Sequence, residues 1–148
     1  MYEALKEAQK AEKINEVPIG AVIVKDDQII GRGYNLTETT KDPTMHAEII
    51  AIREATANIG YSRLYGCTMY VTCEPCTMCA GALILARLKK VVIGTMDRKT
   101  GACGSIYNLV QQDKLNHQLE IQTGVLAEEC STMMTNFFKK LRQSKSEE

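Results

Sequence analysis

Four segments of the chain carry apolar residues at helical spacing. The first, residues 2–13, places Tyr2, Leu5 and Ala8 on one side, which predicts an amphipathic helix. Residues 76–86 are apolar nearly all round, which is typical of a helix buried in the middle of a domain. A third predicted helix starts near His46, and its buried face is formed by Ile49, Ile52, Ala55 and Ile59. The fourth spans 127–141, and its buried face is formed by Ala127, Cys130, Met134, Phe137 and Leu141.

Short β-rich runs lie between these segments. Residues 19–24 and 28–34 flank Asp26-Asp27, which indicates a β-hairpin. Further strands are predicted at 67–72, at 91–94 and, more weakly, at 119–121. Strands that alternate with helices predict a three-layer α/β/α sandwich, with helices on both faces of one five-stranded sheet.

The length and composition are those of an ordinary globular protein. Of 148 residues, 45% are hydrophobic and 24% are charged, so we expect a single domain over 1–148 with a polar tail from about 143. The chain shows neither the ~20 consecutive apolar residues of a membrane span nor the charged-then-apolar start of a signal segment. We therefore expect a cytoplasmic protein with no membrane partner.

Net charge does not point to a partner, because Lys plus Arg and Asp plus Glu both total 18. Residues 87–99 are nevertheless rich in basic side chains, with Asp97 as their single acid. Charge alone favours solvated surfaces as the explanation. The basic residues of this segment are Arg87, Lys89, Lys90, Arg98 and Lys99.

The most specific chemistry belongs to His46, Glu48, Cys76 and Cys79. One imidazole and two thiolates can hold one Zn²⁺ per chain and leave its fourth position open to water. The metal lowers the pKa of that water from about 15.7 toward ~7. Glu48 is too close to His46 in sequence to be a relaxed fourth ligand, and it is well placed to move a proton to or from the water. The pattern therefore predicts a catalytic zinc site.

Both ligand groups are predicted at helix starts. Cys76 and Cys79 are three residues apart, so they lie on one side of a helix, and Pro75 suits its first turn. Unpaired N–H groups at a helix start favour anionic sulfur. Thr44, in the turn sequence Asp-Pro-Thr, is placed to cap the helix at His46. Two such helix starts facing each other could bring the three ligands together.

The cysteines leave other interpretations open. Six cysteines could form disulfides, but the missing export signal favours reduced thiols. Cys73, Cys76 and Cys79 also form C-x-x-C-x-x-C, which is typical of iron–sulfur sites or closed Cys₃His zinc sites. With Cys73 as fourth ligand the metal would be closed and structural. Pro75 breaks the backbone between Cys73 and the helix, which favours the open site.

The H-x-E and P-C-x-x-C motifs and the blocks around them resemble a known family. From residue 1 to about 142, the chain resembles the bacterial tRNA adenosine deaminases of the cytidine deaminase-like superfamily. The paired motifs are the signature of zinc nucleobase deaminases, and the flanking blocks favour the tRNA branch. Two features depart from the family pattern: Cys73 stands where a larger apolar residue is common, and the N-terminus is short. The blocks are 16–22, 34–35, 42–49, 74–82, 97–105 and 116–117.

The resemblance implies a reaction, an assembly and a set of site residues. Zinc held by His46, Cys76 and Cys79 would activate water for attack on C6 of a wobble adenosine, with Glu48 shuttling protons and inosine as product. It also implies a mixed sheet, a homodimer and a tRNA anticodon stem-loop as substrate, with no DNA expected. Asp97 could accept a hydrogen bond from a ribose 2′-hydroxyl, which distinguishes RNA from DNA. The implied substrate-binding residues are Asn35 and Ala47 at the purine, and Asp97, Lys99, Asn116 and His117 at the RNA loop.

Three classes of function fit these residues. The first is deamination of wobble adenosine, for which the resemblance suggests an arginine tRNA. The second is deamination of a free nucleobase or nucleoside, such as guanine or cytosine, at the same zinc site. The third is a zinc-stabilised binding module without activity. Turnover of an RNA stem-loop against that of small bases separates the first two, and a Glu48→Ala variant would leave the third unchanged.

Overall fold

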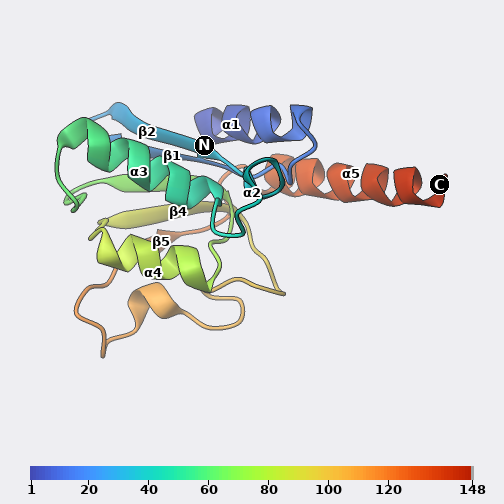
Figure 1. The fold of residues 1–148 in the computed structure, drawn as a ribbon. Coiled ribbons are helices and arrows are strands. Elements are labelled where there is room, and N and C mark those ends of the chain that lie inside the picture. The colour runs from blue at the N-terminus through green and yellow to red at the C-terminus, as the bar shows by residue number, and fades with distance from the viewer. Residues whose placement is uncertain (148) are drawn as a thin grey trace.

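The computed structural model describes residues 1–147 as one mixed β-sheet with helices on both of its faces (Figure 1). The sheet has five strands in the order β2-β1-β3-β4-β5. The strands are β1 (Gly20–Lys25), β2 (Gln28–Tyr34), β3 (Thr68–Cys73), β4 (Lys90–Thr95) and β5 (Glu120–Gln122). The helices are α1 (Tyr2–Lys13), α2 (Thr37–Thr40), α3 (Ala47–Ile59), α4 (Thr77–Leu85), α5 (Ala127–Ser146) and the 3₁₀ turn η1 (Leu109–Gln111).

The strand directions follow from the connections. β1 pairs antiparallel with β2 and β3, whereas β3, β4 and β5 run parallel. Asp26 and Asp27 join β1 to β2 with φ angles of 49° and 62°, the left-handed conformation that a tight two-residue hairpin requires. The predicted hairpin and the predicted mixed sheet are both confirmed.

The three layers can be traced from neighbouring positions on β1. Gly20 lies against α1, whereas Ala21 belongs to the core formed with α3 and α4. Successive strand residues point to opposite faces, so α1 and α3 cover opposite sides of the sheet. α5 contacts β4 and β3 on the face that α1 covers, where Gly94 meets Cys130 (Figure 1). The predicted three-layer sandwich is confirmed.

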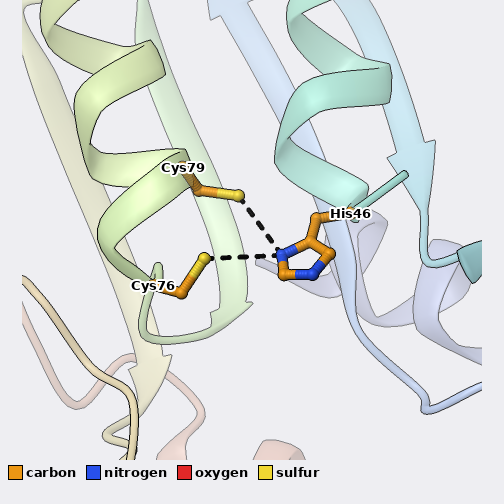
Figure 2. A group of neighbouring side chains, drawn as sticks. All are labelled: His46, Cys76 and Cys79. Atoms are coloured by element: carbon orange, nitrogen blue, oxygen red, sulfur yellow. Dashed lines mark hydrogen bonds between the residues drawn. The ribbon is translucent and has the colours of Figure 1, made fainter. Parts of the chain in front are cut away.

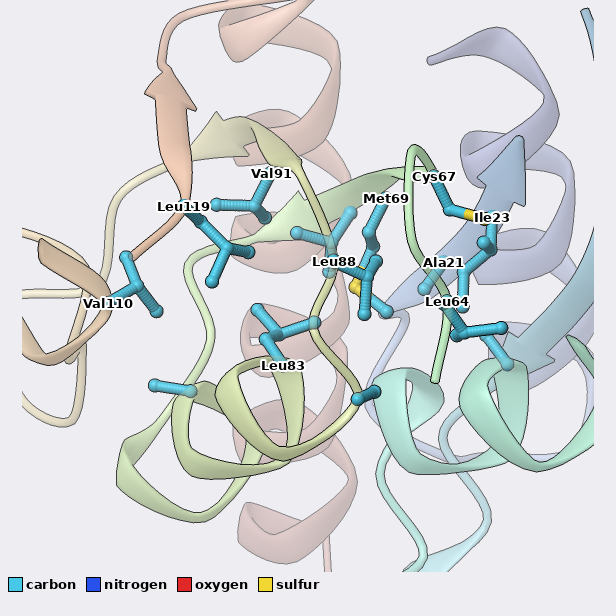
Figure 3. Packing of buried hydrophobic residues seen from close by; sticks show 14 of the residues in the cluster. Ala21, Ile23, Leu64, Cys67, Met69, Leu83, Leu88, Val91, Val110 and Leu119 are labelled. Atoms are coloured by element: carbon cyan, nitrogen blue, oxygen red, sulfur yellow. The ribbon is translucent and has the colours of Figure 1, made fainter. Parts of the chain in front are cut away.

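The main core lies between the sheet and the helices α3 and α4 (Figure 3). Ile23, Met69 and Leu83 are among its fully buried side chains. This packing fixes the two helices whose N-termini carry the candidate metal ligands. The core therefore holds the ligand-bearing N-termini of α3 and α4 next to each other at one end of the sheet.

The buried face of α3 differs from the predicted one. Ala55 is fully buried as predicted, but the other fully buried apolar positions are alanines that were not predicted, and the predicted isoleucines are only half-buried. The reason lies on β2, where a Cβ at Gly33 would overlap the carbonyl oxygen of Ala47 and lie 2.7 Å from the backbone nitrogen of Ala51. Only a helix with small residues on its inner face can approach the strand this closely. The residues concerned are Ala47, Ala51 and Ala55, and the half-buried isoleucines are Ile49, Ile52 and Ile59.

Replacement of Gly33 by Ala is expected to destabilise the protein by roughly 1–3 kcal/mol, because α3 and β2 must move apart. Urea denaturation would measure the loss. Gly81→Ala is the control, because a Cβ on Gly81 meets no atom within 4 Å and Ala gains up to about 1 kcal/mol of helix propensity. Equal stability of the Gly33→Ala variant and the wild-type protein would contradict the close packing.

Three further expectations about burial are wrong. α4 is not buried all round, because Leu85 on its outer side is 76% exposed. Tyr2 is 69% exposed, although Leu5 and Ala8 on the same helix are buried. α5 is helical as predicted and continues to Ser146, into the predicted polar tail, whose last residue lies outside the described range. Only Cys130 of its predicted face is fully buried, because the helix projects past the sheet (Figure 1).

No helix within residues 1–147 combines the length and the apolar character that crossing a membrane requires.

Candidate active site

His46, Cys76 and Cys79 meet where the first turns of α3 and α4 face each other (Figure 2). His46 is the N-cap residue of α3 and Cys76 is the N-cap residue of α4, both with extended backbone. Nδ1 of His46 lies 3.5 Å from Sγ of Cys76 and 3.5 Å from Sγ of Cys79. The three ligand atoms all lie within 4.8 Å of one another. The group can therefore hold a metal ion.

The helix starts are built differently from the prediction. Thr44 does not cap α3, because its amide (2.8 Å) and hydroxyl (2.6 Å) both donate to the carboxylate of Asp42. This closes the turn before the helix and leaves His46 as N-cap. Pro75 likewise precedes the cap of α4 and does not occupy its first turn. Both ligand groups still stand at helix starts, as the spacing predicted.

The distances fit a tetrahedral ion. Metal–sulfur bonds of about 2.3 Å and metal–nitrogen bonds of about 2.1 Å place nitrogen and sulfur ~3.6 Å apart at a tetrahedral angle. The two observed separations of 3.5 Å match this value. A ligand set of one imidazole and two thiolates is one that zinc prefers. The residues present thus fit zinc, with one corner left for another ligand.

Protonation of the two thiols is coupled. A hydrogen bond from Cys79 lowers the pKa of Cys76 to about 4. Burial acts against this shift, and a hydrogen bond with His46 adds to it. The hydrogen bond between Cys76 and Cys79 raises the pKa of Cys79, so the two sulfurs hold a single proton between them. A divalent cation bound there would displace this proton and keep both sulfurs anionic. The site is therefore electrostatically prepared for a cation.

Cys73 stands apart from this group. Within residues 1–147, the cluster of metal-binding side chains contains His46, Cys76 and Cys79 without Cys73. Burial, and then the nearby carboxylates, raise the pKa of the Cys73 thiol well above its usual range. This geometry favours the open metal site over the closed one.

A cavity of about 220 Å³ opens beside the three ligands. Glu48 lies in its wall, in the first turn of α3, and is 4% exposed. Burial raises the pKa of its carboxyl group, which favours the protonated form and makes proton uptake easier. A carboxyl group with a raised pKa next to a metal position suits a general acid and base.

The cavity wall contains three of the six predicted substrate-binding residues, namely Asn35, Ala47 and Asp97. Asn35 at the end of β2 is almost fully buried there, and Ala47 lies beside it at the start of α3. Sequence reasoning did not single out several other wall residues. These are Val17, Ile19, Thr37, Glu74 and Thr100. The family blocks 16–22, 74–82 and 97–105 contain all of these residues except Thr37, but no role was predicted for any of them.

Asp97 stands at the rim, in the loop after β4. Its carboxylate accepts hydrogen bonds from the amide of Lys99 (2.9 Å) and from the amide and hydroxyl of Thr100 (3.3 and 2.8 Å). These bonds lower its pKa against the effect of burial, which is the largest influence and acts to raise it. The side chain of Lys99 is exposed beyond the rim. Asp97 is thus a fixed anionic group at the mouth of the cavity.

Asn116 and His117 lie at the opposite end of the strands from the cavity. The imidazole of His117 is half-buried, with Nε2 2.7 Å from the carbonyl oxygen of Leu88, just before β4 begins. Cys73 pairs with Thr95 at the other end of these strands, next to the cavity. Within one subunit, Asn116 and His117 therefore do not join the other predicted site residues.

Comparison with known proteins finds deaminases among the relatives of this chain. Residues 1–142 match the model of the MafB19-like deaminase family. The tRNA-specific adenosine deaminase of Bacillus subtilis (strain 168) is 52% identical over 145 residues, which cover 98% of this chain and 90% of the relative. That of Haemophilus influenzae is 52% identical over 146 residues, with 98% and 84% covered.

Solved structures agree in fold. One that is described with A-to-I editing by tRNA:A34 deaminases at the wobble position superposes with a TM-score of 0.86 at 41% identity, covering 90% of this chain and 96% of the other. A guanine deaminase from Nitrosomonas europaea has a TM-score of 0.79 at 18% identity, covering 90% and 80%, and shares the fold alone. A deaminase fold, a His/Cys/Cys group with a buried glutamate beside it, and close relatives of nearly equal length lead to one conclusion: the chain belongs to the family of the tRNA-specific adenosine deaminases.

Proposed function

We propose that this protein hydrolytically deaminates adenosine to inosine at the wobble position of a tRNA anticodon. The observation that carries the proposal is the open group of His46, Cys76 and Cys79, with buried Glu48 beside it, at the wall of a cavity of about 220 Å³. The assignment to RNA follows from relatives that are named tRNA-specific adenosine deaminases and share 52% of aligned residues with this chain.

His46, Cys76 and Cys79 would hold one zinc ion per chain. When bound, zinc supplies Lewis-acid activation of water at neutral pH. Glu48 would accept a proton from the attacking water and deliver it to N1 of adenine, and would then take the proton of the new C6 hydroxyl and deliver it to the leaving amine. Adenosine and water thereby become inosine and ammonia. The raised pKa of Glu48 supports this exchange, because its carboxyl group can both take up and release a proton.

Asn35 and Ala47 would hold the purine. The amide of Asn35 can donate and accept hydrogen bonds, and its near-complete burial fixes its orientation. A base can reach this cavity only if it is splayed out of its stack, which single-stranded RNA loops permit. Asp97 and Lys99 at the rim are placed to meet the nucleotide that enters, with Asp97 accepting from a ribose 2′-hydroxyl.

The protein would act as a cytoplasmic homodimer, with each chain forming one deaminase domain. Asn116 and His117 lie away from the cavity of their own subunit, so in this proposal they would contact RNA bound at the partner's cavity. Leu85, 76% exposed on α4, is the kind of apolar side chain that a subunit contact covers. No DNA or membrane partner is proposed.

The test is inosine formation on a 5′-ACG anticodon stem-loop by zinc-loaded protein, beside the same sequence in DNA and beside free guanine and cytosine. We expect inosine in the RNA, and much less or none in the DNA, because the 2′-hydroxyl is missing there. Turnover of guanine or cytosine without inosine in the RNA would assign the site to free bases instead. The guanine deaminase neighbour does not favour that alternative, since at 18% identity it shares only the fold.

A further inference from the structure

Glu74 is a buried carboxylate directly before Pro75 and Cys76, and only 4% of it is exposed. It accepts backbone hydrogen bonds from Asp97 (2.9 Å), Cys103 (3.0 Å) and Ser105 (3.0 Å). The hydroxyl of Ser105 donates to the same carboxylate. One side chain therefore holds both ends of the loop 97–105, which carries the rim of the cavity.

The loop is shaped around this carboxylate. A Cβ on Gly101 would overlap the carboxylate of Glu74 and lie 2.5 Å from the carbonyl oxygen of Asp97. The amide of Gly101 donates to that carbonyl (2.9 Å), and the amide of Ala102 donates to the carbonyl of Pro75 (2.9 Å). Glycine at this position thus lets the loop close over Glu74. The hydrogen bond from Ala102 to Pro75 also ties the loop to the segment that carries the metal ligand Cys76.

The arrangement uses the full acceptor capacity of the side chain. Four donors converge on the two oxygens of Glu74, and a carboxylate has about four acceptor sites and no donor. Glutamine would turn one of the two oxygens into an NH₂ group facing N–H donors. The loop contains no helix or long strand that could hold it otherwise. Its position relative to the cavity therefore depends on this side chain together with the backbone bond from Ala102 to Pro75.

We infer that Glu74 is a positioning residue for substrate, which holds Asp97 and Thr100 at the mouth of the cavity. It acts through these two residues and not on the metal or the reacting atoms. This inference rests on the proposed function, because it assigns the rim to RNA binding. It predicts that loss of Glu74 weakens substrate binding more than it slows the chemical step.

The experiment compares Glu74→Gln, Glu74→Asp and Ser105→Ala with the wild-type dimer, all loaded with zinc. For Glu74→Gln we expect KM for the RNA stem-loop to rise roughly tenfold or more, with kcat changed by less than about threefold and one zinc per chain retained. Glu74→Asp keeps the charge and should restore part of the loss, and Ser105→Ala, which removes one donor of four, should show a smaller rise. Gly101→Ala should also raise KM, because its Cβ would push the loop away from the carboxylate of Glu74.

A double-mutant comparison separates positioning from general destabilisation. On an Asp97→Ala background, Glu74→Gln should add much less to KM than it does alone, because both changes remove the same contact. Glu7→Gln is the matched control, since Glu7 is also buried but pairs with Lys10 on α1, away from the cavity. Its KM should equal that of the wild-type protein.

Amide hydrogen exchange supplies a readout that needs no activity. Residues 97–105 should exchange faster in Glu74→Gln, while α3 keeps the wild-type rate. Unchanged exchange in this loop, unchanged KM, or loss of zinc from the variant would each overturn the positioning role. Failure of the wild-type protein to form inosine would instead overturn the proposed function, and the exchange data would still decide whether Glu74 holds the loop.

Discussion

Replacement of Glu48 by Gln is expected to reduce inosine formation by roughly 10²–10⁴-fold or more while the metal stays bound. Gln has nearly the same shape as Glu but cannot carry a proton between water, N1 and the leaving amine. Glu48 is not one of the three ligands, so zinc content should remain at one per chain. Single-turnover kinetics on the stem-loop and metal analysis of the same samples would measure both quantities.

The Glu48 variant should also be at least as stable as the wild-type protein. Burial of the carboxyl group raises its pKa, which means that the ionised form is costly to keep in the cavity wall. A neutral amide avoids part of that cost. Glu54→Gln is the control, because Glu54 lies on the exposed side of the same helix and should leave both turnover and stability unchanged. Substantial turnover by Glu48→Gln would rule out the proton-transfer role.

Cys79→Ser should abolish metal binding and activity together, whereas Cys73→Ser should keep one zinc per chain. Serine is a poor ligand for zinc next to thiolate and imidazole. Loss of a ligand should weaken zinc binding by more than the ~10–100-fold typical for loss of a group that only supports a ligand. Competition with a chromogenic chelator would give the zinc affinity of each variant. If Cys73→Ser lost zinc as readily as Cys79→Ser, the metal would be closed and structural.

The ligand group could be predicted from the sequence because metal chemistry restricts both residue type and spacing. His46 and Glu48 had to share a helix start, and Cys76 and Cys79 had to share another. Helix and strand positions followed from apolar periodicity in the same way. These features depend on short stretches of chain, which a single sequence displays directly.

The features that escaped prediction depend on partners far away in the chain. The inner face of α3 is set by Gly33 on β2, so periodicity within α3 found Ala55 but pointed to isoleucines where Ala47 and Ala51 are buried. Glu74 finds its partners 23 to 31 residues downstream, and those partners are mostly backbone N–H groups that leave no trace in residue type. The site of His117 depends on the parallel alignment of β4 and β5, which no local pattern encodes.

The strand β4 separates two groups of basic residues. Arg87, Lys89 and Lys90 stand before or at its start, and Arg98 and Lys99 follow its end beside the cavity. Six residues in a strand span roughly 20 Å, so the two groups of positive charge are separated by about that length. An RNA whose loop fills the cavity would reach the distant group only with its stem. Each neutralised phosphate steepens the dependence of RNA binding on salt concentration. The slope of that dependence is therefore expected to be steeper if one RNA contacts both groups of basic residues than if it contacts only one.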